Sequence, residues 1–597
     1  MSNVTWVYIF LGIYIIYCFY WGLKGYFTEK TSAGYAIAGR SIPFIAFLMA
    51  ATAASFSGWT FIGHPGLIWR DGLAYAFASF YVLTIPITGA FFSKRTWLLG
   101  KRYGFITPGD MYAYYFNNEM VRWLVVLTAF LYSMFYSAVQ LMASAALFHF
   151  VAGVPVTFGA IFMAFIVWFY VCTGGMKASA WVGVIQFVLL VGGIILLGIF
   201  MIAPPDAWTG WTQLSAEVSQ LDKKFLEVPR VINFGLGGAK GESAWTAVMI
   251  LTYMFSLMGI QSSPAFTMWN FGLKSPRPLA WQQAFMSTFL VGFALFFFTA
   301  FQGMGAKILE LKGIMSFAKD ADVVPQLMVK YLPGFALGIV FMGAIAAIHS
   351  TAAPYINTGG SILLRDVYYR YIRKMKAGHA EQIWVNRVLA TFVTVAALTV
   401  GLNSKAALVI LGALATAFGF VMYVLLMGVI WGFRFPAIGA ALGTLAGMVA
   451  VFVTYYIWPN PLSMHSAFWG TFVGLAVAYG CRGLGIKDKE ETIKRQAELR
   501  AFLDDIDAPS ESARKWRSAM KIIVPVWYFF AIGPACILGN NAFSFAGFPP
   551  IWSWQIAWWI AGIVMMWGLC FKAEMSTTSA IQLDRAEKET MYVIKEA

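Results

Sequence analysis

The residues best suited to chemistry lie in the stretch 342–366, inside a long apolar run that is typical of a membrane helix. At helical spacing, one face of this stretch collects Ala347, Ser350, Thr351, Pro354 and Thr358. Two adjacent hydroxyls, together with backbone carbonyls that Pro354 releases from the helix ladder, form a set of neutral oxygen donors. Such a set suits a weakly held, exchangeable cation such as Na⁺. Ordinary packing between membrane helices, which also favours Ser, Thr and Ala, is the alternative.

The composition indicates a membrane protein with many spans. The chain has 597 residues, of which 60% are hydrophobic and 12% are charged, about half the charged fraction of a soluble domain. The formal net charge of +15 does not indicate nucleic-acid binding, because the basic residues lie in short loops between apolar runs. There they are expected to set the orientation of the chain and to contact anionic lipid.

No sequence pattern indicates an enzyme. The five cysteines are scattered without a C-x-x-C pair, which argues against a disulfide framework and a thiolate metal site. No cluster of His, Asp and Glu, and no activated nucleophile, falls at membrane depth.

About fifteen apolar runs are long enough to cross a membrane. The predicted order is an extra helix with a cytoplasmic linker (1–42), a first repeat (43–203), an outer interfacial loop (204–243), a second repeat (244–433), two additional helices (434–484), a charged cytoplasmic helix (485–519), two C-terminal helices (520–572) and a cytoplasmic tail (573–597). Loops rich in Lys and Arg alternate with loops nearly free of them. This alternation predicts an outside N-terminus and a cytoplasmic C-terminus, in what we expect to be a bacterial cytoplasmic (inner) membrane.

Two helices at corresponding places in the two repeats are interrupted. The first reads A-T-A-A-S-F-S-G-W over residues 51–59, and the second reads G-I-Q-S-S-P over residues 259–264. Paired interruptions of this kind are typical of inverted-repeat transporters, whose binding sites lie near the membrane midplane. The chain is therefore predicted to be a transporter.

Several motifs occur in order along the chain. They are A-G-R-S-I-P (38–43), S-F-S-G-W-T-F-I-G-H-P-G (55–66), T-G-G-M-K-A (173–178) and A-A-I-H-S-T-A-A (346–353), which runs on to L-L-R-D-V-Y (364–369). On these motifs, residues 4–484 resemble the solute:sodium symporter family, which includes sodium/proline, sodium/pantothenate and sodium/glucose symporters. The resemblance implies an all-α polytopic membrane protein with a LeuT-like 5+5 inverted-repeat core and about fifteen transmembrane helices.

The resemblance also implies a sodium site. In relatives, backbone carbonyls of the first core helix meet a carbonyl and two hydroxyls of the eighth. These positions correspond here to Ala53 and Phe56, and to Ala347, Ser350 and Thr351. The last three are the residues that helical spacing already placed on one face.

The chain departs from its relatives at two acidic positions. Many sodium-coupled relatives have an Asp where this chain has Ser55 and Gly183. A neutral oxygen cage should hold Na⁺ more weakly than one that includes a carboxylate. His349, beside Ser350, is a candidate for modulating the site or carrying a proton, which would make H⁺ the coupling ion. The alternative is a neutral histidine that is hydrogen-bonded to a neighbouring helix.

The solute pocket is expected between the broken helices. The predicted lining residues are Ser57, Trp59, Tyr136, Gln140, Tyr253 and Gln261, with Thr416 and Phe418 as further candidates. Gln140 carries an amide in an apolar helix, so it must find a polar partner on another helix or on a ligand. Aromatic packing without a ligand is the alternative for this set.

These observations predict a secondary transporter that takes up a small organic solute, such as an amino acid or a monocarboxylate, with Na⁺ by alternating access. Proton coupling through His349 is one alternative. A transporter-like sensor or partner-binding subunit is another, with a cytoplasmic or membrane partner docked on residues 485–572.

Overall fold

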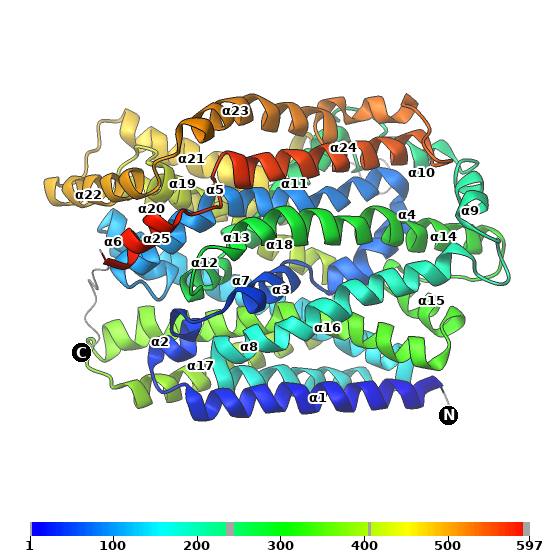
Figure 1. Cartoon of the computed structure of the whole chain (residues 1–597), viewed down its shortest axis with the longest axis horizontal. Coiled ribbons are helices and arrows are strands. Elements are labelled where there is room, and N and C mark those ends of the chain that lie inside the picture. Colours follow the sequence, from blue (N-terminus) through cyan, green and yellow to red (C-terminus); the bar gives the residue numbers. More distant parts are fainter. Residues whose placement is uncertain (1–2, 235–243, 404–407, 589–597) are drawn as a thin grey trace.

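The computed structural model describes residues 3–234, 244–403 and 408–588. Within these ranges the chain is helical, and its only β-structure is two isolated bridges. Figure 1 shows most helices running side by side along the long axis, with α1 (Asn3–Thr28) at one edge and α23 (Glu511–Ala531) and α24 (Pro550–Trp567) at the other. Residues 235–243 of the predicted outer loop and 589–597 of the predicted tail lie outside the described residues.

The bundle is built from helices of nine or more residues. Besides α1, α23 and α24 they are α3 (Phe44–Ser55), α4 (His64–Ala76), α5 (Tyr81–Tyr103), α6 (Pro108–Phe116), α7 (Glu119–Ala152), α8 (Val156–Ile202), α11 (Ala247–Ser262), α12 (Pro264–Gly272), α14 (Ala300–Leu311), α15 (Val323–Tyr331), α16 (Gly334–Ile362), α17 (His379–Asn403), α18 (Leu408–Val421), α19 (Tyr423–Trp431), α20 (Ala437–Phe452) and α21 (Ser466–Gly483). Shorter or peripheral helices are α2 (Ser32–Ile37), α9 (Trp211–Val218), α10 (Lys223–Leu226), α13 (Pro278–Ala280), α22 (Glu490–Ile506) and α25 (Ala580–Lys588).

Ten helices in the described residues are long and apolar enough to cross a membrane, or eleven if the bent pair Glu511–Ala531 and Pro534–Asn541 forms one span. The predicted number of fifteen is not confirmed by this count. Part of the difference lies in α8, whose 47 residues are more than twice the length that one span needs. Gly175 interrupts α8 with a non-helical backbone, so two helical segments are counted there as one.

Gly175 is required where α8 bends. Its φ is +59°, a left-handed value that favours glycine, and a Cβ at this position would lie 2.3 Å from the backbone oxygen of Tyr35. The T-G-G-M-K-A motif therefore marks a close approach between α8 and α2.

Both predicted helix interruptions are present. The first helix ends with α3 at Ser55 and resumes in a π-helical turn, Trp59–Gly63, that leads into α4. The second ends with α11 at Ser262 and resumes at once with Pro264, because the extended Ser263 caps the new helix with its hydroxyl.

The start of α3 and the end of α12 are joined through their backbones. The N–H of Ile42 donates to the carbonyl of Gly272 at 3.1 Å, and the N–H of Lys274 donates to the carbonyl of Ile42 at 3.1 Å. The two broken helices are therefore tied together at this end of the bundle.

The C-terminal helices pack onto the core. The indole N–H groups of Trp559 and Trp552 donate to the carbonyls of Thr288 and Phe296, each at 2.8 Å. These carbonyls belong to π-helical turns in the stretch 281–299. In such turns the backbone departs from the regular α-helical bonding pattern.

The predicted charged helix, α22, also leads into the core. Asp507, at its end, lies 2.6 Å from Lys94 and 2.8 Å from Arg95 of α5, and these three side chains are largely buried. Figure 1 places α22 and α25 at the opposite end of the bundle from the start of α1. That placement agrees with termini on opposite membrane sides, while the side that each faces remains a prediction.

Candidate functional site

The polar face of α16 lies against the broken end of α3. The hydroxyl of Ser350 donates to the carbonyl of Ala53 at 3.0 Å, and the hydroxyl of Thr351 donates to the carbonyl of Ala54 at 3.5 Å. Four of the five residues predicted for the cation site (Ala53, Ala347, Ser350 and Thr351) thus belong to one contact between two helices.

Within α16, the hydroxyl oxygens of Ser350 and Thr351 also lie 3.0 and 3.3 Å from the carbonyl oxygen of Ala347, so each single O–H is shared between a carbonyl of α3 and one of its own helix. Pro354 lies inside the same helix and has no N–H, so the Ser350 carbonyl has no donor four residues later. The contact therefore gathers carbonyl oxygens from α3 and hydroxyl and carbonyl oxygens from α16.

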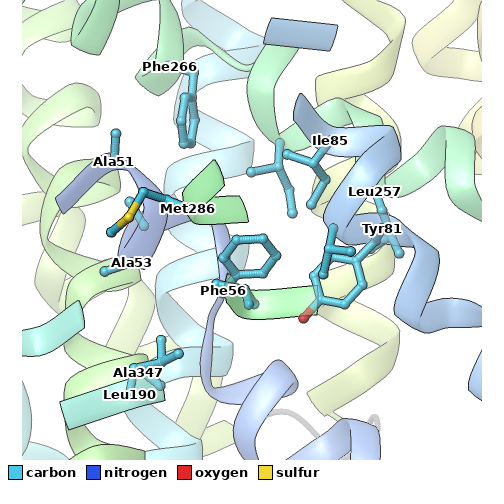
Figure 2. Packing of buried hydrophobic residues seen from close by; sticks show 14 of the residues in the cluster. Ala51, Ala53, Phe56, Tyr81, Ile85, Leu190, Leu257, Phe266, Met286 and Ala347 are labelled. Carbon is cyan, nitrogen blue, oxygen red and sulfur yellow. The ribbon is translucent and has the colours of Figure 1, made fainter. Parts of the chain in front are cut away.

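Phe56, the fifth predicted residue, lies in the break itself. Its N–H donates to the carbonyl of Ala53 at 3.2 Å, and its ring packs edge-on against Tyr81 at a centroid distance of 5.2 Å. Figure 2 shows Ala53, Phe56 and Ala347 together, where the ribbon leaves the helix beside Phe56. Within the described part of the chain, Phe56 makes no hydrogen bond to α16, so its predicted role rests on its place in the break.

The site is buried and electrically neutral. The five residues are between 0% and 4% exposed. In the described ranges, no group of three His, Cys, Asp or Glu side chains is arranged to hold a metal ion. Hydroxyl and carbonyl oxygens are hard, uncharged ligands, which fits an alkali cation that must be released again and does not fit a transition metal.

The structure gives a physical reason for Gly183. A Cβ at this position would lie 2.4 Å from the Cβ of Ala50, so α8 and α3 touch where the family resemblance led us to expect a carboxylate. Ser55, the other departure, donates its hydroxyl to the carbonyl of Ala51 at 3.0 Å and lines the cavity described next.

A cavity lies beside the break in α3. It is lined by five of the six residues predicted to contact the solute, Ser57, Trp59, Tyr136, Gln140 and Tyr253, and also by Thr416. Side chains from α7, α11 and α18 therefore meet around the first interruption. Lys319 and Asp322, on the connection between α14 and α15, also line it.

Gln261 and Phe418 do not line this cavity. Gln261 faces α5 instead, where a Cβ on Gly89 would lie 2.2 Å from its amide oxygen and 2.7 Å from the amide nitrogen of Gln283. The predicted solute contact of Gln261 is therefore not brought to the cavity.

Sequence reasoning missed the apolar part of the lining. Val139, Ala143 and Leu147 line the cavity from α7, and Leu257 and Ile260 line it from α11. The α7 residues continue the face of Tyr136 at helical spacing, so extending that face by two turns would have found them. No sequence signal indicated Lys319 or Asp322.

His349 points toward other helices. Its Nδ1 lies 3.1 Å from the hydroxyl of Tyr14 on α1, and that hydroxyl accepts a hydrogen bond from Gln186 of α8 at 2.7 Å. The neighbouring Ser350 bonds instead to α3, because consecutive residues of a helix point about 100° apart. These contacts favour the structural alternative for His349, and proton coupling remains a prediction.

The comparisons with known proteins agree with this fold and site. The model of the Sodium:solute symporter family matches residues 35–447, well over half of the chain, and the protein belongs to this family. It is thus a membrane transporter rather than an enzyme, and the family supports Na⁺ as its coupling ion.

Two relatives illustrate the breadth of the family. The sodium/pantothenate symporter of Escherichia coli (strain K12) is 24% identical over 60% of this chain and 71% of its own length. The sodium/glucose cotransporter of Vibrio parahaemolyticus is 22% identical over 78% of this chain and 87% of its own length.

A solved structure of a Na⁺-coupled sialic acid symporter, in a substrate-bound outward-open state, has a TM-score of 0.68 with 17% sequence identity. The alignment covers 81% of this chain and 99% of that one. The shared fold is therefore the LeuT-like arrangement that the family resemblance implied.

Proposed function

We propose that this protein takes up a small organic solute, of the amino acid or monocarboxylate type, together with Na⁺ by alternating access. The cation would be held by the carbonyls of Ala53 and Phe56 and by the oxygens of Ala347, Ser350 and Thr351. The observation that supports this most strongly is the contact of Ser350 and Thr351 with the last carbonyls of α3.

A cation between α3 and α16 can couple binding to movement. When bound, it would attract oxygens from both helices and favour the arrangement in which they touch. When released, it would leave the two hydroxyl–carbonyl hydrogen bonds of Ser350 and Thr351 across this contact. A ligand that binds one of two conformations more tightly shifts the population toward it, which is how the ion would bias access.

The lining of the cavity supports the proposed class of solute. Its polar groups near the break are hydroxyls and one amide, whereas its charged residues, Lys319 and Asp322, lie on a connecting segment. A buried charge without a counter-charge is strongly disfavoured. A zwitterion, or a monocarboxylate that shares the site with Na⁺, brings its own compensation and leaves an apolar part for Leu257 and Ile260. Relatives named for pantothenate and glucose support a small solute in general.

Uptake into proteoliposomes tests this proposal. Radiolabelled amino acids and monocarboxylates should accumulate when Na⁺ is supplied outside, and accumulation should stop when K⁺ replaces Na⁺. Accumulation driven by a pH gradient alone would favour the proton-coupled alternative with His349. Binding without accumulation would favour a sensor.

We also propose the bacterial inner membrane as the location, with the N-terminus outside. Reporter fusions at each terminus would test this, because only a cytoplasmic C-terminal fusion of green fluorescent protein should fluoresce. A partner on residues 485–572 has less support, since Asp507, Trp552 and Trp559 bind the protein's own core.

A further inference from the structure

Gln140 lies near the middle of α7 and its amide faces two ways. Its side-chain oxygen accepts a hydrogen bond from the backbone N–H of Gly58 at 3.1 Å. An N–H can only donate, so the amide atom toward Gly58 must be the oxygen, and the NH₂ group must point elsewhere. The amide nitrogen is buried, and within the described residues it has no hydrogen-bond partner.

Gln140 is also part of the cavity wall. A buried donor without a partner is unfavourable unless something else accepts its hydrogen bond. Since this donor belongs to a residue of the cavity lining, a ligand in the cavity is the natural acceptor.

Gly58 is wedged between two helices. A Cβ on this residue would lie 2.4 Å from Cγ1 of Ile348 on α16 and 3.3 Å from the side-chain oxygen of Gln140. Ile348 precedes Ser350 by two residues on the same helix. The backbone of the break is therefore held at Gly58 by the helix that lines the cavity and by the helix that carries the cation-site hydroxyls.

The N–H of Gly58 needs an outside partner because a new helix begins there. The N–H of Thr60 already bonds to the carbonyl of Ser57 at 2.8 Å, and the N–H of Trp59 bonds to the hydroxyl of Ser57 at 3.2 Å. The first N–H groups of a helix have no partner within the helix itself. Gln140 supplies that partner from α7, and so fixes the break that follows the carbonyls of Ala53 and Ala54.

We propose that Gln140 is the positioning residue that couples solute occupancy to Na⁺ affinity. Its NH₂ group donates to an acceptor oxygen of the solute, a carboxylate or a carbonyl. Its oxygen holds Gly58, and thereby keeps the last carbonyls of α3 in place for the cation. This inference rests on the proposed Na⁺-coupled function and names the residue that joins its two sites.

Linkage makes the proposal measurable. If the solute fixes the Gln140 amide, saturating solute should raise Na⁺ affinity, and Na⁺ should raise solute affinity by the same factor. We expect a factor of about five or more, at the low end of measured coupling between sites.

The experiment uses the full-length protein in nanodiscs and measures equilibrium binding of ²²Na⁺. Gln140→Met removes both the acceptor and the donor at similar length, while Gln140→Glu keeps an acceptor for Gly58 and removes the donor. Thr128→Val is the matched control on α7, because within the described residues the Thr128 hydroxyl bonds only to Leu124 of its own helix and to the sulfur of Met448. L-Proline and potassium acetate serve as the solute probes.

Without solute, we expect Gln140→Met to weaken Na⁺ binding about fivefold or more and Thr128→Val to stay within about twofold of the parent protein. These factors lie at the low end of coupling between sites. Gln140→Glu should bind Na⁺ at least as tightly as the parent protein, because its carboxylate keeps the acceptor for Gly58 and adds a negative charge near the cation. With solute, at least one probe should raise Na⁺ affinity in the parent protein and in Thr128→Val, but in neither Gln140 variant. A purely structural role would lower the number of folded sites and the melting temperature, while the Na⁺ affinity of the remaining sites stayed unchanged.

Unchanged Na⁺ affinity in Gln140→Met without solute would overturn the proposal. A probe that raises the Na⁺ affinity of Gln140→Met by the same factor as that of the parent protein would also overturn it. If neither probe affects the parent protein, the acceptor-bearing solute assigned here is contradicted. Failure of the parent protein to bind ²²Na⁺ at all would instead contradict the proposed function, so the two failures are distinguishable.

Discussion

The hydroxyl of Ser350 donates to the carbonyl of Ala53 at 3.0 Å, across 297 residues of sequence. This hydrogen bond joins a continuous helix, α16, to the end of an interrupted one, α3. It brings neutral oxygens of the two helices together, and none of the residues of the predicted site carries a charge. The consequences for ion binding, packing and stability can each be tested.

Removing a hydroxyl from this contact should weaken Na⁺ binding. We expect Ser350→Ala to raise the Na⁺ concentration for half-maximal uptake about tenfold, equivalent to about 1.4 kcal/mol, because the cage loses one ligand. Thr351→Ala should act in the same direction. Ser361→Ala is the control, since Ser361 lies on the same helix and bonds to Asn386 at 3.0 Å, away from α3. A Na⁺ dependence that is the same in Ser350→Ala and Ser361→Ala would exclude the site.

The close contact at Gly183 should be intolerant of a methyl group. Because its Cβ would lie 2.4 Å from that of Ala50, Gly183→Ala should force α8 and α3 apart and cost about 1–3 kcal/mol. Gly192 offers a matched control on the same helix, since nothing lies within 4 Å of a Cβ there. Melting temperatures in detergent compare the two variants, and we expect a lower value for Gly183→Ala alone. Equal melting temperatures for the two variants would mean that the packing against Ala50 does not explain why position 183 lacks a carboxylate.

A buried cluster of ion pairs should make stability depend on pH. Asp110 lies 3.3 Å from Arg122 and 3.4 Å from Arg365, and Arg122 also pairs with Asp366. Burial acts to raise the pKa of Asp110, but Arg365 and Arg122 outweigh it and lower the pKa below its ordinary value. The unfolded state therefore binds the proton more readily. The stability that Asp110 contributes is present above about pH 4 and is lost as the pH falls through the lowered folded-state pKa.

Asp110→Asn should consequently be less stable than the parent protein at neutral pH, by about 3 kcal/mol, because it leaves buried arginines short of one carboxylate. The difference should narrow below about pH 4, where the parent protein begins to lose the same charge. Denaturant midpoints at neutral and acid pH measure this. A gap that stays constant over the whole range would show that the charge of Asp110 does not stabilise the fold.

The C-terminal extension should be needed for a stable core. Asp507→Ala would leave the buried Lys94 and Arg95 without their shared carboxylate, a change that typically costs about 3–5 kcal/mol. Asp505→Ala is the control, because the Asp505 side chain is 63% exposed and pairs with Arg585. We expect a large loss of folded protein in size-exclusion chromatography only for Asp507→Ala. Similar yields of folded protein for both variants would show that the core does not need Asp507, and would favour residues 485–572 as a binding site for a partner.

Helical periodicity was sufficient to place three residues of the proposed cation site on one helix face. Ala347, Ser350 and Thr351 share a face because the geometry of an α-helix is local and repeats every 3.6 residues. The interruptions near Ser55 and Ser263 were also readable, because small, hydroxyl-bearing and proline residues weaken a helix where they occur.

Directions between helices were less predictable. Whether Gln261 contacts solute depends on which helix faces the end of α11. In the structure, the Gln261 side chain lies beside Gly89 and Gln283. His349 stood beside Ser350 in sequence, yet its ring lies next to Tyr14 of α1.

The sequence by itself determined the membrane class, the two interrupted helices, the family resemblance and the hydroxyl face of α16, because each depends on residues close together along the chain. Only the tertiary structure decided that Ser350 meets Ala53, that Gln140 holds Gly58 and that Gly183 leaves no room for a carboxylate. These relationships join residues tens to hundreds of positions apart. Their geometry follows from how closely whole helices pack, which no local pattern encodes.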